Sequence, residues 1–458
     1  MRTEAIKVKK GLDIPLGGVP ERRIIDARSI GRYAVKPPDV VGFTPRLMVA
    51  EGDTVVAGQP LVTDKNDERL FLPSPVSGTV SAIVRGEKRR LMEVVVDYEF
   101  RKLNYEKADA SDSEFKIRNS KLEESPVWWM IKERPFGTIA NPDHKPKGIF
   151  VSMRDTNPLA PDIDFALKGR EQEFEAGCKA LEELAPLHVV KAEGPHPAGN
   201  IGTIVAALAP INKGECIWHV GAQDVANIGR WVISGEYRPE RVIAVGGPAA
   251  KAPHYYRVLC GASLKQITDA QLIDADYPSM NTQDNLSKAN TQTRIISGSP
   301  LSGTIVATDG FLGMYDQQVC FIEEGNQYDF MGWLMPGIKK FSFSKTFLSG
   351  FMGLIDKTGV LSLLGDVKPS YSVNTNVHGS VRPFLFTGSF ERVFPFDIYP
   401  LQLIKACIVG DVELQEKLGI YEVEPEDFAL CEFIDPSKTE IQTTVREALE
   451  VLRKEATA

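Results

Sequence analysis

The chain has 458 residues, of which 43% are hydrophobic and 25% charged, and its formal net charge at pH 7 is −8. This length predicts about three domains with cores of their own, so folding needs neither disulfides nor metals. The acidic balance argues against a nucleic-acid-binding protein, which usually carries a basic domain, and no apolar stretch approaches the ~20 residues of a membrane span.

Six cysteines and six histidines are scattered along the chain. The cysteines form no C-x-x-C pair, and the histidines show no spacing typical of zinc ligands. Iron–sulfur clusters are usually held by closely spaced cysteine runs. We therefore expect no disulfide, no iron–sulfur cluster and no metal site in this chain.

Residues 1–110 predict a small all-β domain. Short β-rich runs alternate with turns at Gly52, Gly58 and Gly78, where glycine supplies a positive φ that other residues resist. The pattern resembles the lipoyl/biotinyl-type barrel-sandwich hammerhead. Carrier members of that group bear a modifiable lysine at a hairpin tip. Lys65 stands at the tip, but its neighbours depart from the carrier pattern, so we interpret it as an exposed turn residue.

Residues 111–260 predict a Rossmann-like α/β domain. A highly charged stretch at 99–125 overlaps its start, and we interpret that stretch as a linker or an exposed helix before the first strand of the domain. Alternating strands and helices are typical of a parallel sheet covered by helices. The predicted strands are 148–152, 187–190 and 241–245, and the predicted helices are 171–184, 201–208 and 220–233.

Two further regions complete a multidomain α/β fold class. Residues 261–330 return to short β-like runs with glycine turns, which indicates a small β-grasp-like domain of the SLBB type. Residues 331–458 predict a mixed to helical C-terminal region, in which Ser437–Glu440 reads as a capping box. The helix that follows carries one apolar stripe, made of Ile441, Val445, Ala448, Leu449 and Leu452.

One loop, residues 191–203, is the candidate ligand site. It follows a predicted strand and opens a predicted helix, where free N–H groups and the helix dipole favour an anion. It lacks the full G-x-G-x-x-G spacing, and its two prolines remove N–H groups, so a rigid structural turn is the alternative. Its histidine could donate a proton to a quinone or flavin carbonyl, or be a hydrogen-bonding structural residue. The candidate ligand-binding residues are Gly194, Pro195, His196, Gly199 and Gly202.

The segment from Glu193 to Leu264 resembles two related flavoproteins, the NADH-binding flavin subunit of respiratory complex I and the C subunit of the Rnf complex. In those relatives a G-x-G-G-A-G-F-P-T loop cradles FMN. Residues 194–199 of this chain read Gly-Pro-His-Pro-Ala-Gly instead. The double-glycine phosphate cradle is absent, which argues against FMN binding.

The Gly-Pro-His-Pro-Ala-Gly version resembles the A subunits of the sodium-translocating NADH:quinone oxidoreductases. Residues 6–15, 74–78 and 391–395 match that family in the same order. The resemblance implies a six-subunit bacterial complex that passes electrons from NADH to ubiquinone or menaquinone and exports sodium. It further implies a subunit without a tightly bound cofactor on the cytoplasmic face of the inner membrane. NAD and flavins would lie in partner subunits, and quinone is the candidate ligand here.

The alternative function is an FMN-binding electron-entry subunit of the Rnf or complex I type. A quinone site would be an apolar cleft with a few polar groups, and the aromatic stretches 330–335 and 341–347 are candidates for one. We interpret both as core or as a docking surface for membrane subunits. No complete active site is expected in this chain.

Overall fold

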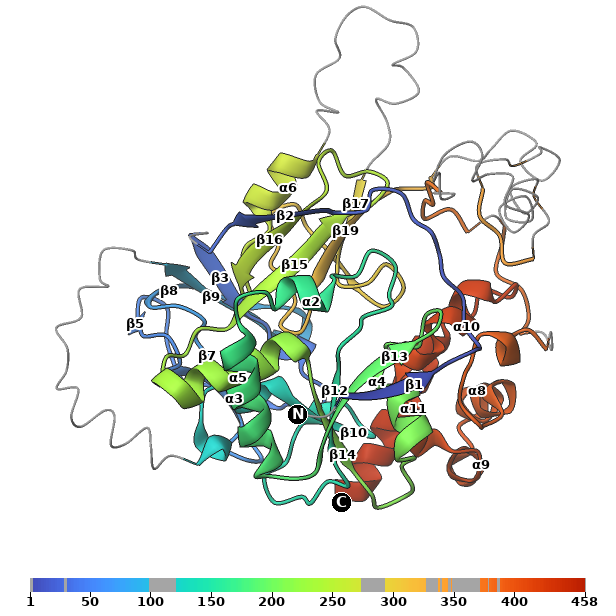
Figure 1. The fold of residues 1–458 in the computed structure, drawn as a ribbon, viewed down its shortest axis with the longest axis horizontal. Helices are drawn as coiled ribbons and strands as arrows, with labels where there is room; N and C mark the ends of the chain where they lie inside the picture. The colour runs from blue at the N-terminus through green and yellow to red at the C-terminus, as the bar shows by residue number, and fades with distance from the viewer. Residues whose placement is uncertain are drawn as a thin grey trace, which may run out of the picture.

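Four β-sheets and a C-terminal group of helices make up the described part of the chain (Figure 1). The predicted aromatic stretch at 330–335 and most of the charged stretch at 99–125 lie outside the described residues. The computed structural model describes residues 3–28, 31–98, 121–272, 293–326, 337, 340–344, 347, 371–377, 379–384 and 388–457.

The first sheet is the predicted α/β sheet. Its first four strands are parallel, and its last two extend the sheet by two successive antiparallel pairings. The strands follow one another in the order β1 (Thr3–Lys7), β13 (Leu187–Glu193), β12 (Ile149–Ser152), β14 (Ile217–Val220), β10 (Ile131–Arg134) and β11 (Thr138–Ile139).

Helices cover both faces of this sheet, because its strands are apolar on both sides. Ile149 and Val151 of β12 belong to the core shared with α3 (Glu171–Glu182) and α5 (Ala222–Ser234). Phe150, between them, packs with α4 (Ile201–Leu208) on the opposite face. The three predicted helices are thereby confirmed.

The chain changes direction across the sheet at β12. From β12 it runs through α3 to β13 on one side, then returns through α4 to β14 on the other side. The carboxyl ends of β12 and β14 therefore form a topological switch point, where open α/β sheets bind their ligands.

The second sheet contains a strand that we expected in the first one. The predicted strand at 241–245 is β15 (Glu240–Gly246), which pairs antiparallel with β16 and parallel with β19 instead of joining the parallel sheet. A short helix, α6 (Lys265–Gln271), follows β16. The strand order is β18 (Thr304–Val306), β17 (Thr293–Ser297), β19 (Gln318–Glu323), β15, β16 (His254–Leu259) and β2 (Glu21–Asp26).

Two antiparallel sheets form the predicted all-β domain. Gly52 and Gly58 have positive φ as predicted, whereas Gly78 begins a strand. Lys65 is exposed after β6. The N-terminal strands β1 and β2 belong to the other two sheets, so the barrel begins only with β3. One barrel sheet has β3 (Arg32–Val35), β9 (Leu91–Tyr98), β8 (Gly78–Arg85) and β5 (Thr54–Val55), and the other has β4 (Pro45–Leu47), β6 (Pro60–Asp64) and β7 (Phe71–Pro73).

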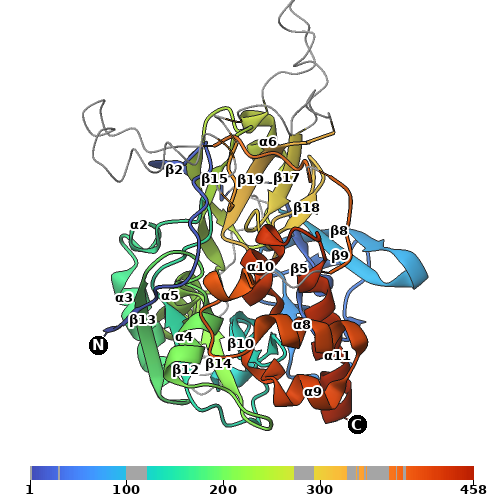
Figure 2. The ribbon, with the colours of Figure 1, turned by 90° about the vertical axis from the view of Figure 1, so that its right-hand side faces the viewer.

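The C-terminal helices pack beside α4 (Figure 2). The predicted apolar stripe of the last helix is buried, with each of its five residues less than 10% exposed. Asp435 helps to hold the preceding turn by accepting hydrogen bonds from the backbone N–H groups of Ser437 and Thr439, at 3.0 and 2.9 Å. The helices are α8 (Pro400–Val409), α9 (Val412–Lys417), α10 (Ala429–Ile434) and α11 (Ile441–Thr457).

Short helical turns connect these elements. The α-helical turn α2 (Ile163–Ala166) precedes α3. The 3₁₀ turns are η1 (Pro37–Asp39), η2 (Glu87–Arg89), η4 (Leu122–Glu124), η5 (Trp128–Met130), η8 (Phe390–Arg392), η9 (Ile420–Glu422) and η10 (Pro425–Phe428).

Among the described residues no helix combines the length and apolar character needed to span a membrane.

Candidate functional site

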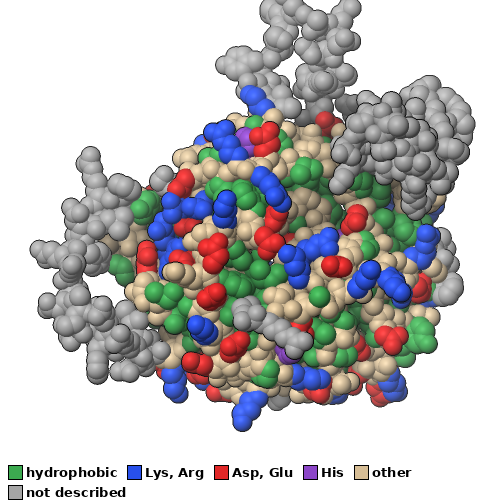
Figure 3. Space-filling view, in the orientation of Figure 1, with side chains coloured by type: hydrophobic (Ala, Val, Ile, Leu, Met, Phe, Trp, Pro, Cys, Tyr) green, Lys and Arg blue, Asp and Glu red, His purple; other side chains and the backbone are tan. Residues whose placement is uncertain are grey.

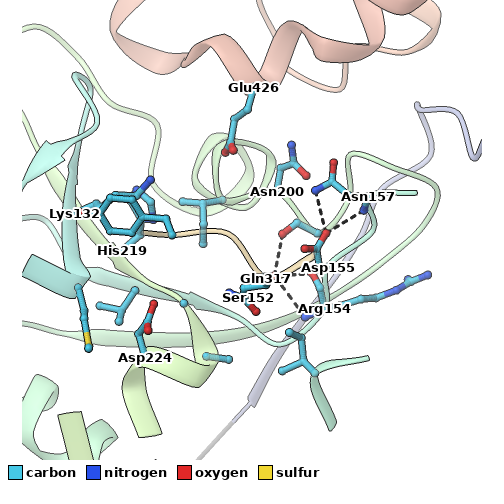
Figure 4. A pocket seen from close by; sticks show the side chains of 18 residues that line it. Lys132, Ser152, Arg154, Asp155, Asn157, Asn200, His219, Asp224, Gln317 and Glu426 are labelled. Atoms are coloured by element: carbon cyan, nitrogen blue, oxygen red, sulfur yellow. Dashed lines mark hydrogen bonds between the residues drawn. The ribbon is translucent and has the colours of Figure 1, made fainter. Parts of the chain in front are cut away.

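A cavity of about 190 Å³ lies at the switch point between β12 and β14 (Figure 4). The loops after these two strands and the first turns of α4 and α5 form its floor and sides. The strand β10 and the loop before β19 add to one side, and η10 of the C-terminal region covers it. Segments far apart in the sequence thus meet at one place.

The segment after β12 forms one wall. The Ser152 hydroxyl donates to the backbone carbonyl oxygens of Gly199 and Arg154, at 2.8 and 2.9 Å. The Asp155 carboxylate accepts from the backbone N–H and the side-chain amide of Asn157, both at 2.9 Å. Burial raises the pKa of Asp155, and the two hydrogen bonds from Asn157 oppose that rise. This wall therefore presents fixed polar groups.

The opposite wall carries Lys132, His219 and Tyr315. The Lys132 ammonium lies 4.7 Å from the centre of the Tyr315 ring, a cation–π distance. Burial, reinforced by the positive charges of Lys132 and Arg134, lowers the pKa of His219 to about 3. The imidazole is therefore neutral near pH 7, and its buried Nε2 has no hydrogen-bonding partner in the described part of the chain.

Asp224 lies in the first turn of α5, at the bottom of the cavity (Figure 4). Its two carboxylate oxygens accept from the Arg241 guanidinium at 2.8 and 2.7 Å, and both side chains are buried. The same guanidinium donates to the carbonyl oxygen of Met314, in the loop before β19. The ion pair therefore joins α5, which covers the first sheet, to β15 of the second sheet.

Glu426 points into the cavity from η10 (Figure 4). Behind it, the fully buried Arg134 guanidinium lies 3.1 Å from Glu424 and 2.6 Å from Asp427. Burial would raise the pKa of Glu424, but Arg134 holds it at about 2. Desolvation by the protein atoms packed around it, then the Asp427 and Glu424 charges, raise the pKa of Glu426 to about 7.

Glu426 is exposed to solvent, although protein atoms surround its carboxyl group closely. A carboxyl group that titrates near neutral pH can take up or release a proton under working conditions. Such shifted groups gather at functional sites, which marks this cavity as the candidate site.

Of the five predicted ligand residues, Gly199 lines the cavity. Its backbone N–H donates to the Thr156 hydroxyl at 2.9 Å. Gly202 lies in the first turn of α4, where a Cβ atom would come within 2.2 Å of Oδ1 of Asp427. Glycine is therefore needed there because η10 approaches the helix closely, and a carboxylate occupies the space above the first turn of α4.

Gly194, Pro195 and His196 do not line the cavity; their loop packs against the N-terminal segment. Gly194 has a φ of +139°, and a Cβ there would come within 2.2 Å of the Val8 carbonyl oxygen. His196 is 1% exposed, and its backbone N–H donates to Asp13 at 2.9 Å. Burial lowers the pKa of His196 to about 4. These contacts fasten the start of the chain to the sheet.

The sequence interpretation missed the segment 152–157 and Glu426. The first has a recognisable signal, because polar residues directly follow a buried strand at the carboxyl end of a parallel sheet. Glu426 has no local signal, since it reaches the cavity only through the packing of the C-terminal helices.

None of the described residues of the predicted aromatic stretch 341–347 lines the cavity. Phe341 and Phe343 are partly buried against the core of the C-terminal region. The Phe341 ring lies 5.6 Å from that of Tyr371, and the Arg392 guanidinium lies 4.6 Å from the Phe343 ring centre. These contacts favour the interpretation as core.

Family models match three parts of the chain. Residues 6–99 match the NqrA N-terminal barrel-sandwich hybrid domain, residues 116–193 and 184–237 the NqrA second alpha/beta domain, and residues 242–277 the NQRA C-terminal domain of SLBB type. The chain is therefore a multidomain α/β protein with these three domains and a helical C-terminal part. The boundaries at 110, 260 and 330 stay predictions.

Full-length relatives agree with the family models. The A subunit of the Na(+)-translocating NADH-quinone reductase of Haemophilus influenzae (strain PittGG) is 35% identical over 478 residues, covering 98% of this chain and 100% of the relative. The corresponding protein of Yersinia pestis is 34% identical over 476 residues, and that of Pasteurella multocida 35% over 477, with the same coverage. The expected resemblance is confirmed: the chain belongs to the family of A subunits of the Na⁺-translocating NADH-quinone reductases.

Proposed function

We propose that this subunit supports electron transfer from NADH to ubiquinone or menaquinone, coupled to Na⁺ export, and that its cavity contacts the quinone head group. The observation that carries the proposal is the convergence of Glu426, Lys132 and His219 on one cavity at the switch point. Quinone reduction consumes two protons and two electrons, so a carboxyl group that titrates near pH 7 is a suitable proton source.

The size and lining of the cavity suit a ring rather than a whole cofactor. Pockets that enclose a complete small molecule usually measure ~300–1,000 Å³, and this cavity is smaller. Apolar contact comes from Met130, Ile163 and Val220, while the polar groups stand on opposite walls. A flat ring with two carbonyl oxygens could accept hydrogen bonds from both sides.

The charges around α4 argue against FMN. A helix N-terminus favours a phosphate only where no other anion competes for it. Here Asp427 lies against the first turn of α4, and Asp155 and Glu426 line the same cavity. A phosphate would meet these carboxyl groups in a confined space. We therefore propose that this subunit binds no flavin, and that NAD and flavins lie in partner subunits.

We also propose the arrangement that the family resemblance implied. The partners are the other subunits of a six-subunit complex, including membrane subunits, on the cytoplasmic face of the inner membrane. Acidic and basic side chains are interspersed on the face shown in Figure 3. Lipid surfaces attract clusters of basic residues, so we expect docking through protein contacts and no binding of the purified chain to anionic vesicles.

We also propose a more specific fold type for each of the three domains. The N-terminal barrel is lipoyl/biotinyl-like, the second domain is Rossmann-like and the third is β-grasp-like.

Quinone contact can be tested on the purified full chain with a water-soluble short-chain quinone and tryptophan fluorescence. Trp129 packs 5.5 Å from the Tyr315 ring at the cavity, so a bound quinone should quench it. Ala222→Leu, which narrows the cavity, should abolish saturable quenching. Glu413→Gln on the exposed side of α9 is the matched remote change and should leave it intact. Quenching that does not saturate, or that survives in Ala222→Leu, would place the quinone elsewhere.

The alternative electron-entry function has its own readout. The chain is incubated with FMN, desalted and examined for flavin absorbance. A colourless protein supports the proposal, whereas retained stoichiometric flavin would favour the FMN-binding alternative.

A further inference from the structure

Three side chains with metal-ligand chemistry meet outside the cavity. They are Glu133 on β10, His144 in the loop after β11, and Cys216 directly before β14. Each offers one ligand atom, and these three atoms all lie within 4.8 Å of one another. Their spacing along the chain follows no metal motif, so the sequence predicted no metal site.

The Glu133 carboxylate is already fixed in place. It is 6% exposed, and one of its oxygens accepts from the Trp218 indole N–H at 2.9 Å and from the Asn141 backbone N–H at 3.3 Å. The other oxygen lies 2.8 Å from Nδ1 of His144. Carboxylate ligands in metal sites are typically oriented by hydrogen bonds of this kind from surrounding groups.

The remaining two ligands leave the cluster open to solvent. The His144 side chain is 50% exposed. All six cysteines lie in described segments, and Cys216 is the one among them that is not buried. An ion could therefore enter from the surface, and the exposed imidazole can adjust its position to complete a coordination shell.

The donor set selects the kind of metal. Sulfur, nitrogen and carboxylate oxygen together suit Zn²⁺, whereas Ca²⁺ and Mg²⁺ prefer oxygen ligands only. A tetrahedral shell with zinc bond lengths of ~2.0–2.3 Å separates its ligand atoms by about 3.3–3.6 Å. The observed ligand atoms, all within 4.8 Å of one another, need to approach by at most about 1.5 Å to reach that geometry. A thiolate with a carboxylate supplies two negative charges for a divalent ion.

We propose that Glu133, His144 and Cys216 form a Zn²⁺ site with its fourth position open to water. The site joins the loop before β12 to β10 and to the residue directly before β14, two neighbouring strands of the first sheet. It is separate from the cavity, none of whose lining residues belongs to it.

The test uses the full chain, stripped with a chelator and titrated with Zn²⁺ and with Co²⁺. We expect one site, whose affinity falls at least ~10-fold in His144→Gln and in Cys216→Ser. Co²⁺ should produce a sulfur-to-metal absorption band in the wild type and no such band in the Cys216→Ser protein. His188→Gln and Cys407→Ser, which change the same residue types elsewhere, are the matched controls and should bind as the wild type does.

Thiol labelling gives a second readout that is independent of the metal titration. Cys216 should react first with a thiol reagent, and Zn²⁺ should slow that reaction. In His144→Gln, which leaves the partly exposed Cys216 thiol in place, Zn²⁺ should give no protection. Equal Zn²⁺ binding in the wild type, His144→Gln and Cys216→Ser, or a Co²⁺ complex without the sulfur band, would overturn the proposal.

Discussion

Asp427 lies directly over Gly202: a Cβ atom on Gly202 would come within 2.2 Å of Oδ1 of this carboxylate. The contact joins η10 of the C-terminal region to the first turn of α4. It also places a negative charge where a phosphate-binding loop would leave space for its ligand. The close approach of Asp427 to Gly202 therefore packs the C-terminal region against α4 and also shapes the cavity.

Gly202→Ala should destabilise the protein by about 1–3 kcal/mol, the usual cost of overpacking. Urea unfolding followed by tryptophan fluorescence measures the change. Gly31→Ala is the control, because Gly31 has open space around its Cβ position and should tolerate alanine. If Asp427 is the obstacle, adding Gly202→Ala to an Asp427→Ala background should cost less than it does in the wild type. Additive effects would refute the contact.

Arg134 should be the most sensitive ion-pairing residue of this interface. It is 1% exposed and pairs with two buried carboxylates, so Arg134→Met leaves them without their countercharge and should cost about 3–5 kcal/mol. Arg69→Met is the matched control. Arg69 pairs with Asp143 at 2.6 Å on the surface, and its loss should cost no more than about 1 kcal/mol. Equal losses of unfolding free energy would contradict the assignment of a buried pair.

The hydrophobic periodicity of the sequence predicted helices and strands better than it predicted which strands pair with one another. The helix at 201–208 was predicted with its observed bounds, and the buried stripe of α11 followed from its apolar spacing. The strand at 241–245 was predicted as a strand but assigned to the wrong sheet. Local sequence gives a strand its apolar character, but the neighbours β16 and β19 that determine its sheet are set by long-range pairing.

The candidate site shows the same contrast between features with a local sequence signal and features set by long-range contacts. The loop at 194–202 was found because glycine and proline mark unusual backbone, yet only Gly199 of the five predicted residues lines the cavity. Glycine is needed at 194 and 202 because Val8 and Asp427 approach these two positions closely. No local sequence pattern reveals these contacts. Glu426 and the Glu133 cluster arise where distant segments meet, so spacing along the chain carries no signal for them.

Glu426 should make the folded state less stable as the pH rises. Its pKa in the folded protein is about 7, above the ordinary 4.5, so the folded state binds this proton more tightly than the unfolded state does. The stabilising contribution is complete below pH 4.5 and is lost as the pH rises through 7. Glu426→Gln should therefore raise the Tm relative to the wild type more at about pH 8 than at about pH 5.

Thermal unfolding at both pH values tests this. Asn200→Ala changes a neighbouring cavity residue that does not titrate, so its Tm difference from the wild type should be the same at both. A Glu426→Gln difference that is equally independent of pH would show that this carboxyl group has an ordinary pKa.

His196 should give the stability of the folded state the opposite pH dependence to that of Glu426. Burial lowers its pKa from 6.5 to about 4, so the neutral form is favoured in the folded protein, and stability present above pH 6.5 is lost as the pH falls toward 4. That shift corresponds to about 3 kcal/mol. The destabilisation caused by His196→Gln should therefore be smaller at about pH 4.5 than at pH 7.

Thr156→Ala separates this titration from the loss of a contact, because the Thr156 hydroxyl lies 3.3 Å from Nδ1 of His196 and does not itself ionise in this range. Its cost, measured by urea unfolding, should depend less on pH than that of His196→Gln. The same His196→Gln protein should still bind the short-chain quinone, because His196 faces the N-terminal segment rather than the cavity. Loss of saturable quenching in a variant that remains folded would return His196 to the ligand site that its loop first suggested.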